Sequence, residues 1–158
     1  CLRYFNVFGP RQDPRSQYAA AVPIFIDKAL RQEPLTIFGD GGQTRDFIYV
    51  KDVVAANVHA AATPATGVMN VAYGGRMTIL ELARTILRLT GSSSPVTFLP
   101  ERPGDVRHSQ AAIDRLQASG FVPGSDFAGG LATTVAAFRE ARATRHTPGS
   151  GPSSTAAR

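Results

Sequence analysis

Three groups of polar residues stand where predicted strands give way to loops, the edge at which open α/β sheets bind ligands. The groups are Asn6 directly after Tyr4 and Phe5, Arg45 beside Asp46, and Arg102 with Asp105 in the loop 101–105. The forked donors of two arginines and one amide suit the oxygens of a diphosphate, and a carboxylate suits the paired hydroxyls of a ribose. Together the groups predict a site for a nucleotide or another diphosphate compound.

Each group also has a plainer structural interpretation. Asn6 lies on a mostly apolar strand, where its amide could bond neighbouring loop backbone, because a buried amide needs partners away from water. Arg45 and Asp46 could form an ion pair on the surface, and the loop that carries Arg102 could simply be solvated. The residues alone leave both interpretations open.

The sequence carries no recognisable catalytic or metal-binding motif. The three histidines, His59, His108 and His146, are scattered and Cys1 is the single cysteine, so no metal-ligand spacing is present. Neither G-x-G-x-x-G nor a Walker sequence occurs, and no order of Ser, His and Asp suggests a catalytic triad. From its residues alone, the chain is predicted to bind a nucleotide or diphosphate without reaction machinery of its own.

Strands and helices alternate along the chain, which predicts an α/β fold. The expected strands are 2–8, 35–38, 46–50, 68–71 and 96–99, and the expected helices are 21–31, 52–62, 79–89, 112–119 and 126–141. Thr78 and Glu81 match a capping box, Asp126 is a further helix cap, and Gly91 is a stop signal. The folded part should therefore be residues 1–141, and residues 142–158 are predicted to form a disordered basic tail.

Length and composition favour a single folded domain, since 43% of the 158 residues are hydrophobic and 18% are charged. No apolar run reaches the roughly 20 residues that a membrane helix requires, and the lone cysteine fits a reducing cytoplasm. The net charge of +5 does not indicate a nucleic-acid partner, because the unopposed arginines of the tail supply most of it. Aromatic residues that could stack on bases are absent from that tail.

The ordered motifs of the chain resemble the C-terminal half of extended short-chain dehydrogenases/reductases, the NAD-dependent nucleotide-sugar epimerases and dehydratases. The motifs are Leu-Arg-Tyr-Phe-Asn-Val-Phe-Gly-Pro at 2–10, Gly-Asp-Gly at 39–41, Thr-Arg-Asp-Phe at 44–47, Val-Lys-Asp-Val at 50–53, Asn-Val-Ala at 70–72 and Arg-Pro-Gly-Asp at 102–105. The resemblance covers about residues 1–140. It implies the last two parallel strands of a Rossmann-type domain and a small α/β substrate-binding subdomain.

The resemblance also implies roles for individual residues. Tyr4 and Phe5 would contact the NAD cofactor near its nicotinamide. The residues implied for the substrate are Asn6, Arg45 and Arg102 at the diphosphate, Asp105 at the ribose hydroxyls, Phe38 near the nucleobase, and Ala20 and Ala21 along the pocket. The small Ser109, four residues after Asp105, would leave room for an N-acetyl group on the sugar.

The family's catalytic Tyr-x-x-x-Lys pair and its glycine-rich NAD loop do not occur in this sequence. The chain is therefore expected to be the C-terminal portion of a longer enzyme and to be inactive alone, with NAD held mainly by the missing N-terminal half. The resemblance implies that the intact enzyme is a homodimeric UDP-hexose 4-epimerase, cytoplasmic, which interconverts UDP-GlcNAc and UDP-GalNAc. The alternatives are a dehydratase, decarboxylase or reductase of the same superfamily, or a non-catalytic sensor of nucleotide-sugars or NAD.

Overall fold

The structure is a computed structural model, and it describes residues 1–16, 20–124 and 126–146. The helices are α1 (Ala21–Leu30), α2 (Val50–Ala62), α3 (Ile79–Thr90), α4 (Asp114–Ala118) and α5 (Phe127–His146). The strands are β1 (Leu2–Tyr4), β2 (Val7–Phe8), β3 (Leu35–Phe38), β4 (Thr44–Arg45), β5 (Ile48–Tyr49), β6 (Met69–Val71), β7 (Met77–Thr78) and β8 (Val96–Leu99).

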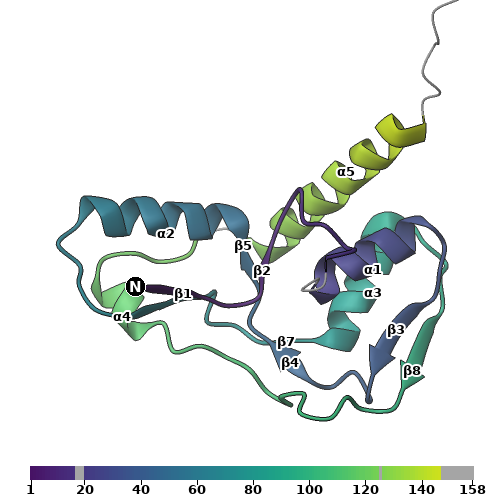
Figure 1. Cartoon of the computed structure of the whole chain (residues 1–158), viewed down its shortest axis with the longest axis horizontal. Coiled ribbons are helices and arrows are strands. Elements are labelled where there is room, and N and C mark those ends of the chain that lie inside the picture. Colours follow the sequence, from purple (N-terminus) through teal and green to yellow (C-terminus); the bar gives the residue numbers. More distant parts are fainter. Residues whose placement is uncertain (17–19, 125, 147–158) are drawn as a thin grey trace, which may run out of the picture.

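The strands form short pairs rather than one continuous sheet. Within the described residues, β1 pairs with β6, β2 with β5 and β3 with β8, all in parallel, while β4 and β7 are antiparallel. Helices connect the parallel partners, as such pairs require. In Figure 1 the pair β1–β6 lies with α2 and α4 at one side of the molecule, and β3 and β8 lie with α1 and α3 at the other. The predicted α/β class with parallel strands is confirmed.

The predicted strand 2–8 is wrong in one respect, because it divides at Asn6. This residue has a φ of 33°, in the left-handed region that Asn tolerates better than most residues. The turn of the backbone sends β1 to pair with β6 and β2 to pair with β5. The predicted strand 46–50 is likewise shorter, since only Ile48–Tyr49 are paired.

Two clusters of buried hydrophobic residues form the core. The larger cluster lies between α1, α3, α5 and β3, and includes Ile26, Leu35 and Leu82. The smaller cluster lies between α2, α4 and β6. The strand β5 contributes to both, because consecutive side chains of a strand point to opposite faces: Ile48 belongs to the smaller cluster and Tyr49 to the larger.

Helix ends follow the local signals in most places. Thr78 Oγ1 accepts from the Glu81 backbone N–H at 3.1 Å and the Glu81 carboxylate accepts from the Thr78 N–H at 2.9 Å, so the predicted capping box is confirmed. Gly91 ends α3 with a φ of 65°, as predicted. Helix α2 begins at Val50, two residues before the predicted Asp52.

Helix α5 is longer than predicted. It continues to His146, so the prediction of a disordered tail from residue 142 is wrong for residues 142–146, and residues 147–158 lie outside the described part. The added turn contains Arg142, Ala143 and Thr144, which allow a helix to continue in the absence of Pro or Gly. Figure 1 shows the C-terminal end of α5 projecting away from the body.

The N-terminal end of α5 is seated closely on the larger cluster. Asp126 caps it, accepting from the backbone N–H groups of Ala128 and Gly129 at 3.2 and 2.9 Å, as predicted. A Cβ at Gly130 would lie 2.9 Å from the Tyr49 ring, so only glycine permits this approach of helix to ring. The Phe127 ring lies 5.2 Å from that of Phe8.

Candidate functional site

A cavity of about 590 Å³ opens along one side of α1. Its lining brings together Asn6, Ala20, Ala21, Phe38, Arg45, Arg102 and Asp105, seven of the residues that the sequence singled out for a substrate. They come from the turn between β1 and β2, the start of α1, β3, β4 and the loop after β8. Residues up to 99 positions apart in the sequence therefore meet at one site.

Arg45 is held by several acceptors. Its Nη1 donates to the carbonyl oxygens of Thr44 at 2.8 Å and of Val106 at 2.6 Å, and its Nη2 forms an ion pair with the carboxylate of Asp105. The side chain of Arg45 is only 17% exposed. A guanidinium fixed in this way presents its remaining N–H groups in a defined direction.

The alternative of a surface pair between Arg45 and Asp46 is not what the structure contains. Asp46 is fully buried, and its carboxylate accepts hydrogen bonds from the backbone N–H groups of Tyr73, Gly74 and Ala111 at 3.0 to 3.2 Å. Burial raises the pKa of Asp46, and these backbone donors act in the opposite direction. Asp46 therefore has a structural role and forms no ion pair with Arg45.

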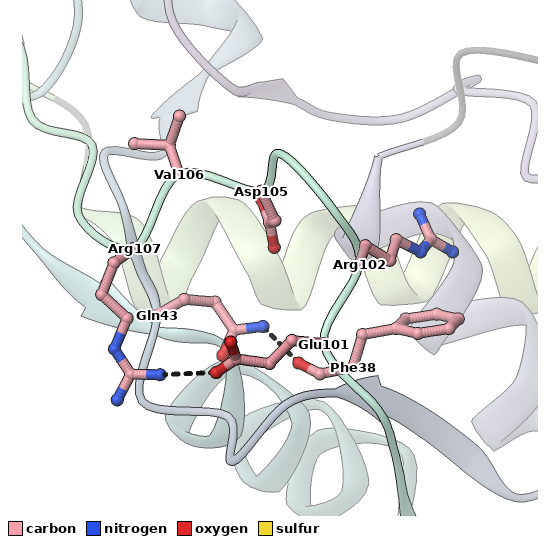
Figure 2. Close-up of a pocket in the computed structure, with 7 residues that line it drawn as sticks. All are labelled: Phe38, Gln43, Glu101, Arg102, Asp105, Val106 and Arg107. Atoms are coloured by element: carbon pink, nitrogen blue, oxygen red, sulfur yellow. Dashed lines mark hydrogen bonds and ion pairs between the residues drawn. The ribbon is translucent and has the colours of Figure 1, made fainter.

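Arg102 lies against an aromatic ring. Its guanidinium carbon is 3.8 Å from the centroid of the Phe38 ring, a cation–π contact on the wall of the cavity. Figure 2 shows both side chains beside a smaller cavity of about 60 Å³, which Phe38, Arg102 and Asp105 share with the larger one. Gln43 lies on the side of Arg107 and donates from Nε2 to the Phe38 backbone carbonyl oxygen at 2.7 Å.

An ion pair that sequence reasoning missed fastens the loop after β8. Arg107 donates from Nη1 and Nη2 to the two carboxylate oxygens of Asp40, each at 2.7 Å. The hydrogen bonds from Arg107, together with one from the Gly42 N–H, lower the pKa of Asp40 to about 2. Because 67 positions separate the two residues, no local pattern could have revealed the pair. It ties the loop that carries Arg102 and Asp105 to the turn after β3.

Helix α1 supplies a further cation that the sequence analysis did not select. Lys28 lines the cavity on the same face of α1 as Ala21 and Ile24, about one turn after Ile24. Its Nζ lies 3.4 Å from Oγ1 of Thr36. The signal was available in the sequence, since positions 21, 24 and 28 share one face of a helix. It could not be weighed before the cavity was known to lie along that face.

Three of the predicted site residues do not line this cavity. Tyr4 is 51% exposed and donates from its hydroxyl to Asn57 Oδ1 at 2.9 Å, and the Phe5 N–H donates to the Val71 carbonyl at 3.1 Å. Ser109 is half-buried beside β4, where its N–H donates to the Thr44 carbonyl at 3.1 Å.

The residues of this chain do not by themselves form an NAD site. Tyr4 and Phe5 provide two aromatic side chains, whereas a dinucleotide also needs a cradle for its pyrophosphate, and the sequence has no glycine-rich loop to supply one. Across the described ranges, no three metal-ligating side chains gather, and no helix is long and apolar enough to span a membrane.

The sequence and the fold of this chain are similar to those of known proteins. Residues 1–73 match the model of the NAD dependent epimerase/dehydratase family. The structure superposes on a UDP-N-acetylglucosamine 4-epimerase of Methanobrevibacter ruminantium in complex with UDP-N-acetylmuramic acid, with a TM-score of 0.85 and 48% identity, over 89% of this chain and 46% of that one. The same coverage and TM-score, with 39% identity, relate it to a UDP-glucose 4-epimerase of Thermotoga maritima with UDP-glucose.

A curated relative gives the same result. The UDP-glucose 4-epimerase of Mycolicibacterium smegmatis is 39% identical over 136 residues, which are 85% of this chain and 43% of the relative. The chain is thus similar to part of the proteins of the NAD-dependent epimerase/dehydratase family. Among those proteins it is similar to UDP-glucose and UDP-N-acetylglucosamine 4-epimerases, and it spans less than half the length of these relatives.

Proposed function

We propose that this chain is the substrate-binding, C-terminal portion of an NAD-dependent UDP-sugar 4-epimerase. The observation that carries the proposal is the convergence of Asn6, Arg45, Arg102 and Asp105 on one cavity. In this assignment Asn6 and the two arginines hold the diphosphate, and Asp105 accepts from the ribose hydroxyls while it remains paired with Arg45. Tyr4 and Phe5 face the cofactor in the intact enzyme, and the chain alone is inactive.

The charges of the cavity support a nucleoside diphosphate. Among the described residues of its lining, Lys28, Arg45 and Arg102 are cationic and Asp105 alone is anionic. The net positive charge of the lining complements the negative charge of a diphosphate, and such complementarity favours association. The start of α1 adds to it, since Ala20 and Ala21 line the cavity at a helix end without a side-chain cap.

The proposed sugar is an N-acetylhexosamine, so that the intact enzyme interconverts UDP-GlcNAc and UDP-GalNAc. This finer assignment rests on the family resemblance at Ser109, which does not line the cavity of this chain. Its small side chain would leave room for the C2 substituent of the sugar in the intact enzyme. Ser109 follows directly on the loop that Arg45 and Arg107 fasten.

Ligand binding to this chain tests the site. Isothermal titration should show UDP and UDP-GlcNAc binding, and Arg102→Ala should weaken both by about tenfold or more, because a hydrogen bond to a charged group contributes about 1.5–3 kcal/mol. Arg88→Ala, on the exposed side of α3, is the matched control and should leave the affinity unchanged. Equal affinities for wild type and Arg102→Ala would reject the assigned site.

Turnover tests the reaction and the sugar. Joined to the N-terminal portion of a related 4-epimerase, the chain should support interconversion of UDP-GlcNAc and UDP-GalNAc, and Ser109→Tyr should abolish that activity while sparing UDP-glucose. Turnover of UDP-glucose without the acetylated pair would contradict the proposed sugar. Binding of UDP-GlcNAc without any turnover in the joined protein would favour a sensor.

A further inference from the structure

The lining of the cavity gives a bound nucleotide a direction. Ala21, Ile24 and Lys28 form one row along α1 and all line the cavity. At about 1.5 Å per residue, the row from the first turn of α1 to Lys28 is about 10 Å long. The uncapped start of α1 suits phosphate, whereas Thr36 of β3 lies with Lys28 toward the other end. A nucleoside diphosphate laid along α1 therefore has its base near Lys28.

Lys28 is a cation without a carboxylate partner in the described part of the chain. The neighbouring carboxylate of Asp27 forms its ion pair with Arg31 at 3.0 Å, and Glu33 also lies nearest Arg31. Among the residues that the structure describes, the one polar group within hydrogen-bonding distance of Lys28 Nζ is the Thr36 hydroxyl, at 3.4 Å. An ammonium group has three donors, so at least two of them remain for an acceptor in the cavity.

We propose that Lys28 selects the nucleobase, by donating a hydrogen bond to the carbonyl oxygen at position 4 of a uracil ring. Uracil carries a carbonyl oxygen at position 4, whereas cytosine carries an amino group there. An ammonium group can only donate, so it stabilises the first base and opposes the second. The flat face of the uracil ring can also contact the Phe38 ring, which lines the same cavity. The inference rests on the proposed function, which supplies the nucleotide but not the residue that distinguishes its base.

Comparison of UDP with CDP tests the inference, because the two nucleotides share the diphosphate and the ribose. Wild-type chain should bind UDP about tenfold more tightly than CDP, since one hydrogen bond to a charged group separates them. Lys28→Met keeps the length of the side chain and should remove most of that ratio. Lys51→Met is the matched control, because Lys51 is the other lysine of the chain and is exposed on α2, outside the cavity.

A spectroscopic measurement keeps the test independent of the variant's folding. Chain labelled with ¹³C at lysine Cε gives two lysine signals, from Lys28 and Lys51. UDP should shift the Lys28 signal, CDP should shift it less, and the Lys51 signal should stay in place. Equal shifts with both nucleotides would overturn the inference.

The outcomes also separate the inference from the proposed function. If Lys28→Met weakens UDP and CDP by the same factor, Lys28 binds phosphate and does not select the base, while the nucleotide site stands. If the variant keeps the wild-type ratio of affinities, Lys28 has no role in selection. If neither nucleotide binds the wild-type chain, the proposed site itself is rejected and the inference with it.

Discussion

At the scale of single residues, Asp46 joins segments that are distant in the sequence. Its carboxylate accepts from Tyr73 and Gly74 after β6 and from Ala111 before α4. All of these donors are backbone N–H groups, so both carboxylate oxygens must act as acceptors. An amide in the same place would direct one NH₂ group at another donor.

Asp46→Asn should therefore destabilise the chain by about 1–3 kcal/mol, the cost of leaving a buried donor unsatisfied. Urea unfolding followed by circular dichroism measures the loss. Glu140→Gln, a similar change at an exposed position of α5, is the control and should be neutral. An unchanged midpoint for Asp46→Asn would show that the loops do not depend on this carboxylate.

The pair of Asp40 and Arg107 predicts a titration. Since the pKa of Asp40 lies at about 2, below its ordinary value of 3.8, the folded chain keeps this carboxylate charged to lower pH than the unfolded chain does. Its contribution to stability is present above pH 3.8 and is lost as the pH falls toward 2.

Carbon-detected NMR of the Asp40 carboxyl group measures that value directly. In Arg107→Gln the pKa of Asp40 should rise toward 3.8, because its largest cause, the hydrogen bonds from Arg107, is removed. Arg84→Gln, another exposed arginine, should not move it. A wild-type value that already lies near 3.8 would show that the pair does not persist in solution.

Residue types predicted which side chains would line a common cavity better than they predicted the partners of those side chains. Asn6, Arg45, Arg102 and Asp105 were selected from their chemistry and their places at strand ends, and they share a cavity. The partner of Arg45 could not be predicted, because Asp105 is 60 positions away whereas Asp46 is adjacent. The short sequence separation favoured Asp46 as the partner, but in the fold Asp46 is buried and bonds backbone N–H groups instead.

At the scale of elements, two adjacent glycines of α5 lead to opposite expectations. A Cβ at Gly130 would lie 2.9 Å from the Tyr49 ring, which is itself buried, whereas one at Gly129 would meet only the exposed Asp126 carboxylate at 3.3 Å. Alanine raises helix propensity equally at both positions, by about 1 kcal/mol. The environment of each position therefore decides whether an alanine there stabilises or destabilises the chain.

Gly130→Ala should lower the melting temperature, because the ring of Tyr49 cannot move out of the larger cluster without a cost of about 1–3 kcal/mol. Gly129→Ala should leave the melting temperature unchanged or raise it, since the capping carboxylate of Asp126 can shift by a few tenths of an ångström. Differential scanning fluorimetry compares the two variants. Equal effects would mean that α5 is not seated on Tyr49.

Elements with local signals were predicted well and elements with tertiary causes were not. The capping box of Thr78 and Glu81 and the stop at Gly91 depend on residues a few positions apart, so the bounds of α3 followed from the sequence. The division of the first strand depends on the conformation of Asn6, which its side-chain type permits but does not require. The early start of α2 likewise has no side-chain cap to mark it.

At the scale of the whole molecule, the chain presents an apolar helix face that nothing in the described part covers. Val54 and Val58 lie one turn apart on α2 and are 58% and 64% exposed. Tyr4 is exposed on the adjoining strand β1, which has β6 on one edge only. Such a surface is typical of an interface, and an edge strand of this kind invites association.

The isolated chain should therefore bind 1-anilinonaphthalene-8-sulfonate and melt over a broad range of temperature. Replacement of Val54 and Val58 by Ser should reduce dye fluorescence, whereas Val106→Ser, at a similarly exposed position in the loop after β8, should not. A sharp melt without dye binding would contradict the expectation that this face is left open.

The short pair β2–β5 is the place where the two hydrophobic clusters meet, since Tyr49 and Phe8 face one and Ile48 and Val7 the other. Asn6, which lines the cavity along α1, immediately precedes that pair. A ligand held by Asn6 is thus anchored to the boundary itself, and its binding energy favours only conformations in which both sides are intact. A bound ligand should therefore make the two hydrophobic clusters unfold together as one cooperative unit. The substrate would then stabilise the fold in addition to being converted by the enzyme.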